Sequence, residues 1–255
     1  MIKLNHSRHG RQSKENELSN CLYSFSMNDE KRNKQARFLY LLLAGIFISL
    51  IVSSNLIFLK FFEWTPVGSF TFVLSVGLIP YPLTFLVTDL ISEFYGKEKA
   101  SDVVKVGLVC ALLIMGLTLL ADAIPAREGS PVNDETFHSV FGLTAAAVTA
   151  SMIAYLFAQL IDIRIFHFWK KKTQGKKLWV RNNLSTIPSQ LVDSFAVITL
   201  LCSFGGIPWD QYWLTVSSLF IFKMLIALAD TPLFYLFTYL IKRHFGLKEM
   251  EELEV

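Results

Sequence analysis

The chain has 255 residues, a net charge of +3 and a charged-residue content of 18%, well below the roughly 25% of an ordinary soluble domain. Its mean hydropathy is positive, and its charges lie in short blocks between long apolar stretches. This pattern is typical of a polytopic helical membrane protein and argues against a soluble globular core. The three cysteines, Cys21, Cys110 and Cys202, show neither metal-ligand spacing nor a disulfide framework.

The first 35 residues are polar and contain no apolar stretch long enough for the central region of a signal peptide. We expect residues 1–35 to form a disordered extension, most of which would be absent if translation began at Met27. Six apolar spans of about 20 residues or more follow, each long enough to cross roughly 30 Å of hydrocarbon. They lie near 36–60, 70–95, 102–124, 139–168, 184–206 and 212–242. The sequence therefore predicts an all-α membrane bundle of six transmembrane helices over residues 36–242, followed by a charged tail over residues 243–255.

The basic residues predict the orientation of these spans. If the spans alternate in direction, fifteen Lys and Arg side chains fall on one side, and only Arg127 and Lys60 fall on the other. Cytoplasmic loops carry the excess of Lys and Arg in membrane proteins. We therefore expect both termini to be cytoplasmic.

Ionisable and amide side chains also occur inside the apolar spans, where each is costly unless it is paired or hydrogen-bonded. Asp89 and Glu93 are four residues apart on the second span and share a helix face. The later spans carry, on one face each, Gln159 with Asp162 one turn beyond Tyr155, Gln190 with Asp193, and Lys223 with Asp230. Most of these groups lie two to three turns from the cytoplasmic ends of their helices. If the faces converge, they form a polar site for a substrate or an ion inside the bundle.

The alternative is that these charges only hold the helices together. Lys223 would then neutralise Asp193 or Asp230, and Arg164 would neutralise Asp162. We favour a site, because intramembrane ionisable residues are usually functional and this chain has more of them than helix pairing requires. Prolines beside the polar positions, at 80, 82, 188 and 232, add support, since transporters place interrupted helices at their binding sites.

Enzyme signatures are absent from the sequence. It has no H-E-x-x-H, no G-x-S-x-G and no phosphate-binding glycine loop. We expect a non-enzymatic protein with no cofactor and no metal, and one that cannot hydrolyse ATP itself.

Four ordered blocks, "YPLTFLVTDLISEFYGKEKA", "AYLFAQLIDIRIFHFWK", "LWVRNNLSTIPSQLVDS" and "FKMLIALADTPLFY", closely resemble those of the queuosine-precursor transporters, also called the vitamin-uptake-transporter or DUF165 family. The resemblance runs from about Asn55 to Tyr239, and Pro188 departs from it where an aliphatic residue is expected. It implies a bacterial inner-membrane importer of a 7-deazaguanine (7-cyano-7-deazaguanine, its aminomethyl analogue or queuine) with no nucleic-acid partner.

A guanine-like edge offers two adjacent N–H donors to a carboxylate and an oxygen to an amide. We expect Asp89 and Glu93 to accept these donors or to hold a coupling proton. The expected ligand hydrogen bonds come from Gln159, Asp162, Gln190 and Asp193, with Lys223 neutralising a carboxylate in the empty site. Further substrate-binding candidates are Asp230, Asn55 and Tyr155; possible stacking aromatics are Phe85, Tyr155 and Phe195; Arg181 is expected to anchor a loop.

Two other functions remain open. The chain could be the substrate-binding subunit of an ATP-driven vitamin importer, for which "LTAAAVTASMIA" in the fourth span offers small residues as a docking surface. It could also be a membrane scaffold that binds no deazaguanine. The sequence leaves open whether the protein forms a homodimer.

Overall fold

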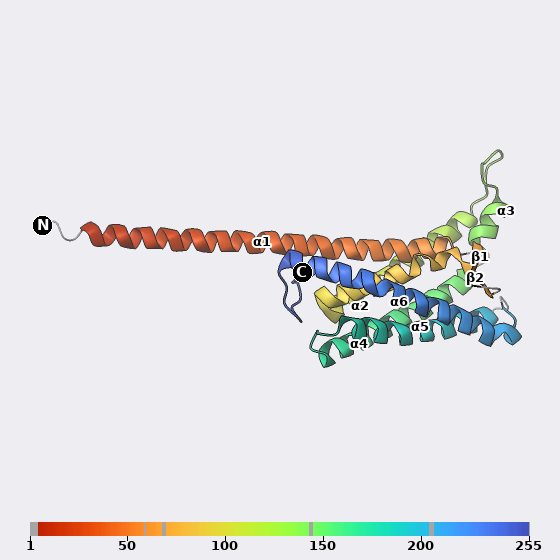
Figure 1. Ribbon diagram of the computed structural model, residues 1–255. Helices are drawn as coiled ribbons and strands as arrows, with labels where there is room; N and C mark the ends of the chain where they lie inside the picture. The colour runs from red at the N-terminus through yellow and green to blue at the C-terminus, as the bar shows by residue number, and fades with distance from the viewer. Residues whose placement is uncertain (1–4, 59, 68–69, 143–144, 204–206, 255) are drawn as a thin grey trace.

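The structure is a computed structural model that describes residues 5–58, 60–67, 70–142, 145–203 and 207–254, with side chains placed from residue 30 onward except in parts of 59–73, 143–151 and 204–206. Helices dominate it (Figure 1). The elements in chain order include α1 (Asn5–Leu56), α2 (Tyr81–Asp122), the short α3 (Asp134–Phe137), α4 (Ala145–Lys172), α5 (Leu178–Ser203) and α6 (Tyr212–Phe245). The all-α class was therefore predicted correctly. The predicted domain limits stay a prediction, although α1 begins at Asn5 and continues without interruption into the first predicted span.

Five helical segments among the described residues are long and apolar enough to cross a membrane, by length and composition. They are Glu30–Leu56, Val76–Asp122, Met152–Lys172, Leu178–Ser203 and Trp209–Phe245. The second has 47 residues, more than twice the roughly 20 that one crossing requires. This segment covers most of the predicted second span and most of the predicted third span.

The helix α2 is interrupted at Gly96, whose φ of 82° and ψ of 174° are not helical. Residues with a side chain rarely adopt this conformation, so glycine is required there. Next to the interruption, the Tyr95 hydroxyl donates to the Ala36 carbonyl oxygen at 2.8 Å. Further on, Gly107 lies against the Phe47 ring, eleven residues further along α1. The second half of α2 therefore runs parallel to α1, whereas the first half approaches Gly96 from the opposite end of the bundle (Figure 1).

The prediction of a helix over 70–95 was wrong for its first part. An antiparallel hairpin of β1 (Phe61–Val67) and β2 (Phe70–Ser75) precedes a single 3₁₀ turn, η1 (Val76–Leu78), and α2 begins only at Tyr81. The segment is rich in Phe, Val and Thr, which favour strands, and an apolar run of this kind cannot be told from a helix by periodicity alone. Pro80 then occupies the N-cap position of α2.

Two serine hydroxyls satisfy backbone carbonyl oxygens that flank this hairpin. The Ser54 hydroxyl donates to the Gly77 carbonyl oxygen, and the Ser75 hydroxyl donates to the Phe58 carbonyl oxygen. Non-helical backbone is tolerated at membrane depth only where it is buried in protein or lines a cavity. Leu74, Ser75 and Gly77 line such a cavity.

The apolar core lies between α1, α2 and α4, with contributions from α6. Its fully buried side chains include Phe47, Ile91, Phe94, Phe166 and Phe234. The interior is unusual in also burying a polar set, mostly from α2, α4 and α5. The candidate functional site is built from these polar side chains.

Candidate functional site

A cavity of about 510 Å³, here called the chamber, lies between α1, α2, α4, α5 and α6 at the end of the bundle that carries the hairpin. Its volume is within the roughly 300–1,000 Å³ of small-molecule sites in proteins. The polar residues that line it include Asn55, Tyr81, Tyr155, Asp193 and Lys223. Aliphatic side chains such as Ile51, Ile198 and Leu214 form much of the remaining wall.

Three of these residues form a buried hydrogen-bonded group. Lys223 donates to Asp193 Oδ2, and the Tyr81 hydroxyl donates to the same oxygen at 2.6 Å. The Lys223 ammonium also lies 4.5 Å from the centre of the Tyr81 ring. Asp193 is 1% exposed, and its second oxygen, Oδ1, has no hydrogen-bond partner among the described residues. The carboxylate is therefore neutralised and still has an acceptor for a ligand.

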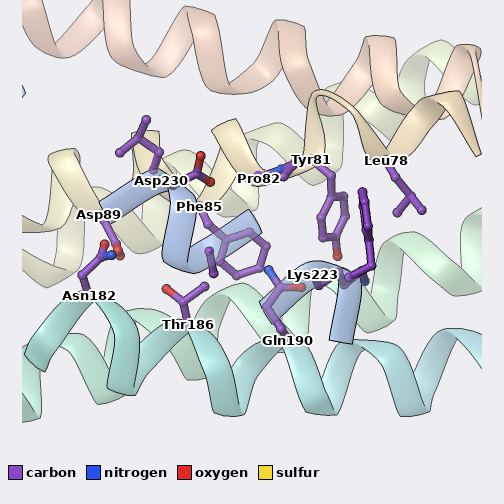
Figure 2. A pocket seen from close by; sticks show the side chains of 13 residues that line it. Leu78, Tyr81, Pro82, Phe85, Asp89, Asn182, Thr186, Gln190, Lys223 and Asp230 are labelled. Carbon is purple, nitrogen blue, oxygen red and sulfur yellow. The ribbon is translucent and has the colours of Figure 1, made fainter. Parts of the chain in front are cut away.

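Lys223, Tyr81 and Leu78 separate the chamber from a second, much smaller space, here called the polar pocket. Its free volume is about 20 Å³, room for about one water molecule. Figure 2 shows Asn182, Thr186 and Gln190 pointing from α5 towards Phe85 and Asp89 of α2. Asp230 of α6 completes the polar lining. The three α5 residues recur every four positions, as one face of a helix requires.

Asp89 belongs to the lining of this pocket, and Asp162 lies behind it. Asp162 is fully buried and accepts a hydrogen bond from the Ser189 hydroxyl at 3.1 Å. The two carboxyl groups interact electrostatically, and Asp89 Oδ1 and Asp162 Oδ2 have no hydrogen-bond partner among the described residues. Arg164 is exposed, so the predicted pairing of Arg164 with Asp162 was wrong. The side chain of Asp162 forms no part of the lining of either cavity.

Gln159 supports the chamber wall from behind. Its Nε2 donates to the Tyr155 hydroxyl oxygen at 2.6 Å, and its Oε1 accepts from the Thr88 hydroxyl at 3.0 Å. The Tyr155 hydroxyl in turn donates to Thr84 Oγ1 at 2.7 Å. Gln159 therefore fixes the orientation of Tyr155, and its own amide is already satisfied.

A second group of charges, the Glu93 cluster, closes the other end of the bundle. Arg181 donates to Glu93 Oε1 at 2.6 Å, with Lys242 Nζ at 3.5 Å from the same oxygen and Lys170 Nζ at 3.9 Å from Oε2. Arg181 is 0% exposed and also donates to the Gly175 carbonyl oxygen at 2.6 Å. This bond lies in the connection between α4 and α5, so the prediction that Arg181 anchors a loop is confirmed.

The C-terminal tail packs over this cluster. Lys170 Nζ donates to Glu252 Oε1 at 2.9 Å, and the Leu253 backbone N–H donates to the Phe94 carbonyl oxygen at 2.7 Å. Leu253 itself is 7% exposed. Glu251 accepts hydrogen bonds from the Lys248 backbone N–H and from a side chain of α1, and these bonds lower the pKa of Glu251.

The charged groups at the chamber floor and in the Glu93 cluster are related by the antiparallel packing of α2 and α5. Tyr81 contacts Asp193, and Glu93 contacts Arg181. Each pair of positions is twelve residues apart on its own helix, which corresponds to about 18 Å along the axis. The chamber floor and the Glu93 cluster thus lie on one line through the bundle, with Asp89 between them.

The structure brings most of the predicted residues to the two cavities. Lys223, Asp193, Asn55 and Tyr155 line the chamber, and Lys223, Asp89, Gln190 and Asp230 line the polar pocket. Of the two partners considered for Lys223, the structure has Asp193.

Other predicted residues lie away from the cavities. Glu93 belongs to the closed end, and Gln159 and Asp162 lie behind the lining. Phe195 packs against Trp213, with ring centroids 6.1 Å apart, and lines neither cavity. Within "LTAAAVTASMIA", residues 143–151 fall outside the described side chains, and Met152 and Ala154 are buried within the chain.

Sequence reasoning missed Tyr81 as a site residue. Its position contained the signal, because Tyr81, Phe85 and Asp89 recur every four residues and so share one face of α2. The same spacing links Asn182, Thr186 and Gln190, of which only Gln190 was a leading candidate.

Comparison with known proteins gives a consistent set of relatives. Residues 75–237 match the sequence model of a family described as "Putative vitamin uptake transporter". The chain is similar to a "Probable queuosine precursor transporter" of Bacillus subtilis (strain 168), with 26% identity over 166 residues, covering 63% of this chain and 70% of that protein. It is also similar to a "Queuosine precursor transporter" of Escherichia coli (strain K12), with 23% identity over 190 residues, covering 72% and 80%. A third relative, from Haemophilus influenzae (strain ATCC 51907 / DSM 11121 / KW20 / Rd), is 24% identical over 163 residues, covering 63% and 66%. No solved structure matches the chain.

Proposed function

Because the chain belongs to the vitamin uptake transporter family, whose model matches residues 75–237, we propose that it imports a queuosine precursor of the 7-deazaguanine class. It is a multi-pass membrane protein with five long apolar helical segments, and it has relatives named as queuosine precursor transporters. The observation that carries the proposal is the chamber, with the half-satisfied Asp193 carboxylate on its floor.

The chemistry of the chamber suits a flat, guanine-like ring. Asp193 Oδ1 is a buried acceptor without a partner among the described residues, and a guanine edge offers adjacent N–H donors. Tyr81 and Tyr155 lie with ring centroids 5.0 Å apart beside it, and base–aromatic stacking contributes about 1–3 kcal/mol per base. Gln190 Oε1 is a second buried acceptor without a partner in the described part of the chain, and it lies in the next space along the axis.

The arrangement of cavities fits transport by alternating access. The chamber is wide at one end of the bundle, and the Glu93 cluster with the C-terminal tail covers the other end. A site near the midplane that is reached from one side at a time is the usual arrangement in secondary transporters. With the chamber open and the Glu93 cluster closed, the substrate enters the chamber and reaches Asp193. The polar pocket and the Glu93 cluster separate it from the opposite side.

We further propose six crossings with both termini in the cytoplasm of a bacterium and the chain in its inner membrane. The interruption at Gly96 divides the 47-residue segment Val76–Asp122 into two crossings. The basic residues of this turn, of the α4–α5 connection and of the end of α6 then lie on one side with the Glu93 cluster, as the excess of positive charge in cytoplasmic loops requires. The chamber would face the periplasm.

The test is salvage in a host that cannot synthesise queuosine and lacks its own precursor transporter. The full chain is expressed, each of the three deazaguanines is supplied separately, and queuosine in tRNA is measured. We expect at least one precursor to restore the modification. Failure of all three with confirmed expression would remove the support for this function.

Two variants test the site within that assay. Gln190→Leu removes an amide whose oxygen has no partner among the described residues, so folding should be preserved and uptake reduced. Asp193→Asn combined with Lys223→Met removes the buried ion pair together and should leave expression intact, while uptake falls roughly ten- to hundredfold through loss of a charge-assisted hydrogen bond. Asp102→Asn, at a side chain that is 61% exposed, is the control. Normal uptake by both site variants would move the substrate elsewhere in the bundle.

A further inference from the structure

Asp89 of α2 and Asp162 of α4 form a buried pair of carboxyl groups beside the polar pocket. Asp89 is 1% exposed and Asp162 is 0% exposed. Hydrogen bonds from Thr88 to Gln159 and from Tyr155 to Thr84 hold this part of α2 against α4, and the two carboxyl groups interact electrostatically. A carboxylate has no hydrogen to donate. Two neighbouring carboxyl groups can therefore form a hydrogen bond with each other only when one of them carries a proton.

The hydrogen bonds around the pair lead to the same conclusion. Ser189 donates to Asp162 Oδ1, but Asp89 Oδ1 and Asp162 Oδ2 receive no hydrogen bond from any group that the structure describes. If both carboxyl groups were ionised, two like charges would lie in contact in a site nearly without water, which is strongly unfavourable. One shared proton removes this repulsion and supplies the missing donor.

The neighbouring cations are engaged elsewhere. The charged and titratable groups that face the pair are Glu93 on α2, Tyr155 on α4, Arg181 on α5, and Lys223 and Asp230 on α6 across the pocket. Arg181 is bound to Glu93 and Lys223 is bound to Asp193. Neither of these two cations forms an ion pair with Asp89 or Asp162.

We propose that Asp89 and Asp162 share one proton and that this proton is the ion whose entry drives uptake, so that the protein works as a proton–substrate symporter. The coupling rests on the transport function proposed above. Asp89 lines the polar pocket, so a substrate that leaves the chamber floor reaches it next. With the proton on Asp162, the Asp89 carboxylate accepts an N–H of the substrate.

Release follows from the position of Arg181. Opening of the far end requires the Glu93 cluster to separate, which frees the Arg181 guanidinium near Asp89. The freed positive charge stabilises the ionised pair, and the proton leaves on the side where the substrate leaves. Each cycle moves one proton and one substrate molecule in the same direction, and no covalent bond of the substrate changes.

A first test is independent of any substrate. Infrared difference spectra of the purified full-length protein in H₂O and D₂O detect a carboxylic acid through its exchangeable C=O band. We expect this band in the wild type, its loss in Asp162→Asn and in Asp89→Asn, and its retention in the exposed control Asp102→Asn. Thermal unfolding establishes that each variant is folded. A band that persists in a folded Asp162→Asn protein would overturn the shared proton.

The second test measures coupling in proteoliposomes with labelled 7-cyano-7-deazaguanine. For one proton per substrate, a gradient of one pH unit supports roughly tenfold accumulation, and a protonophore should abolish it. In Asp162→Asn, whose amide can donate to Asp89 as the proton-bearing acid does, exchange of internal for external substrate should continue although accumulation stops. Accumulation by the wild type that survives collapse of the proton gradient would overturn the coupling. Absence of all uptake by a wild-type protein that shows the infrared band would instead count against the proposed function.

Discussion

Arg181→Met is expected to destabilise the protein more than any exposed substitution, because it orphans a buried carboxylate. Arg181 is 0% exposed and makes two charge-assisted hydrogen bonds of 2.6 Å, to Glu93 and to the Gly175 carbonyl oxygen. Removing one partner of a buried ion pair costs about 3–5 kcal/mol. Lys242 and Lys170 remain within 4 Å of Glu93, so we expect the lower end of that range.

For a chain of this length, about 3 kcal/mol corresponds to a decrease in melting temperature of roughly 6–12 °C. The assay is thermal unfolding of the detergent-purified protein, followed by tryptophan fluorescence. Adding Glu93→Gln removes the orphaned charge and should recover at least half of the loss. Arg243→Met is the matched control, because Arg243 is exposed at the end of α6. A wild-type melting temperature in the single variant, or further loss in the double variant, would refute the assignment of Glu93 to a buried ion pair.

Other features of the fold give three more predictions. Gly77→Ala should lower expression and melting temperature, because the added Cβ would lie 2.5 Å from the Ser54 carbonyl oxygen, a backbone atom; unchanged stability would contradict the close packing of η1 on α1. Leu253→Asp should increase hydrogen exchange across residues 246–254. The control Met250→Asp, at a 45% exposed side chain, should not. Equal exchange in the two variants would show that the tail is not docked through Leu253. The pKa of Glu251 is lowered, so its contribution to docking of the tail is present above the ordinary glutamate pKa and is lost as the pH falls through the lowered value. Hydrogen exchange of the tail, corrected for the intrinsic exchange rate, should therefore rise on acidification. Glu251→Gln should abolish that pH dependence.

The parts of the fold that were predicted correctly depend on local properties of the chain. Apolar length indicates where helices cross a membrane, and the helical period indicates which side chains share a face. Lys223 and Asp230 were placed on one face by their spacing alone, and both line the polar pocket. The same information cannot give the rotation of one helix against another. Glu93 shares a face of α2 with Asp89, yet it pairs with Arg181 at the closed end.

Two other features depend on contacts distant in sequence. The backbone on either side of the hairpin depends on Ser54 and Ser75, whose hydroxyls satisfy the Gly77 and Phe58 carbonyl oxygens in an apolar setting. The docking of the C-terminal tail depends on Phe94 and Lys170, which lie 159 and 82 residues from their tail partners in the sequence. Composition alone indicates only a charged, solvated end of the chain.

The two buried ion pairs have different consequences for the transport cycle, although each joins α5 to a neighbouring helix. A buried ion pair contributes little net stability compared with well-packed apolar side chains, so its retention calls for another reason. At the chamber floor, Asp193 keeps a second oxygen free, and substrate N–H donors can bind it without first displacing Lys223. At the closed end, Glu93 is held by Arg181 with two lysines nearby and the tail above them, and no substrate group competes there. In the proposed cycle, substrate binding at Asp193 therefore leaves the closed end intact. In the proposed cycle, a change in charge at Asp89, which lines the polar pocket and lies one helical turn from Glu93 on α2, transmits occupancy of the chamber to the far end.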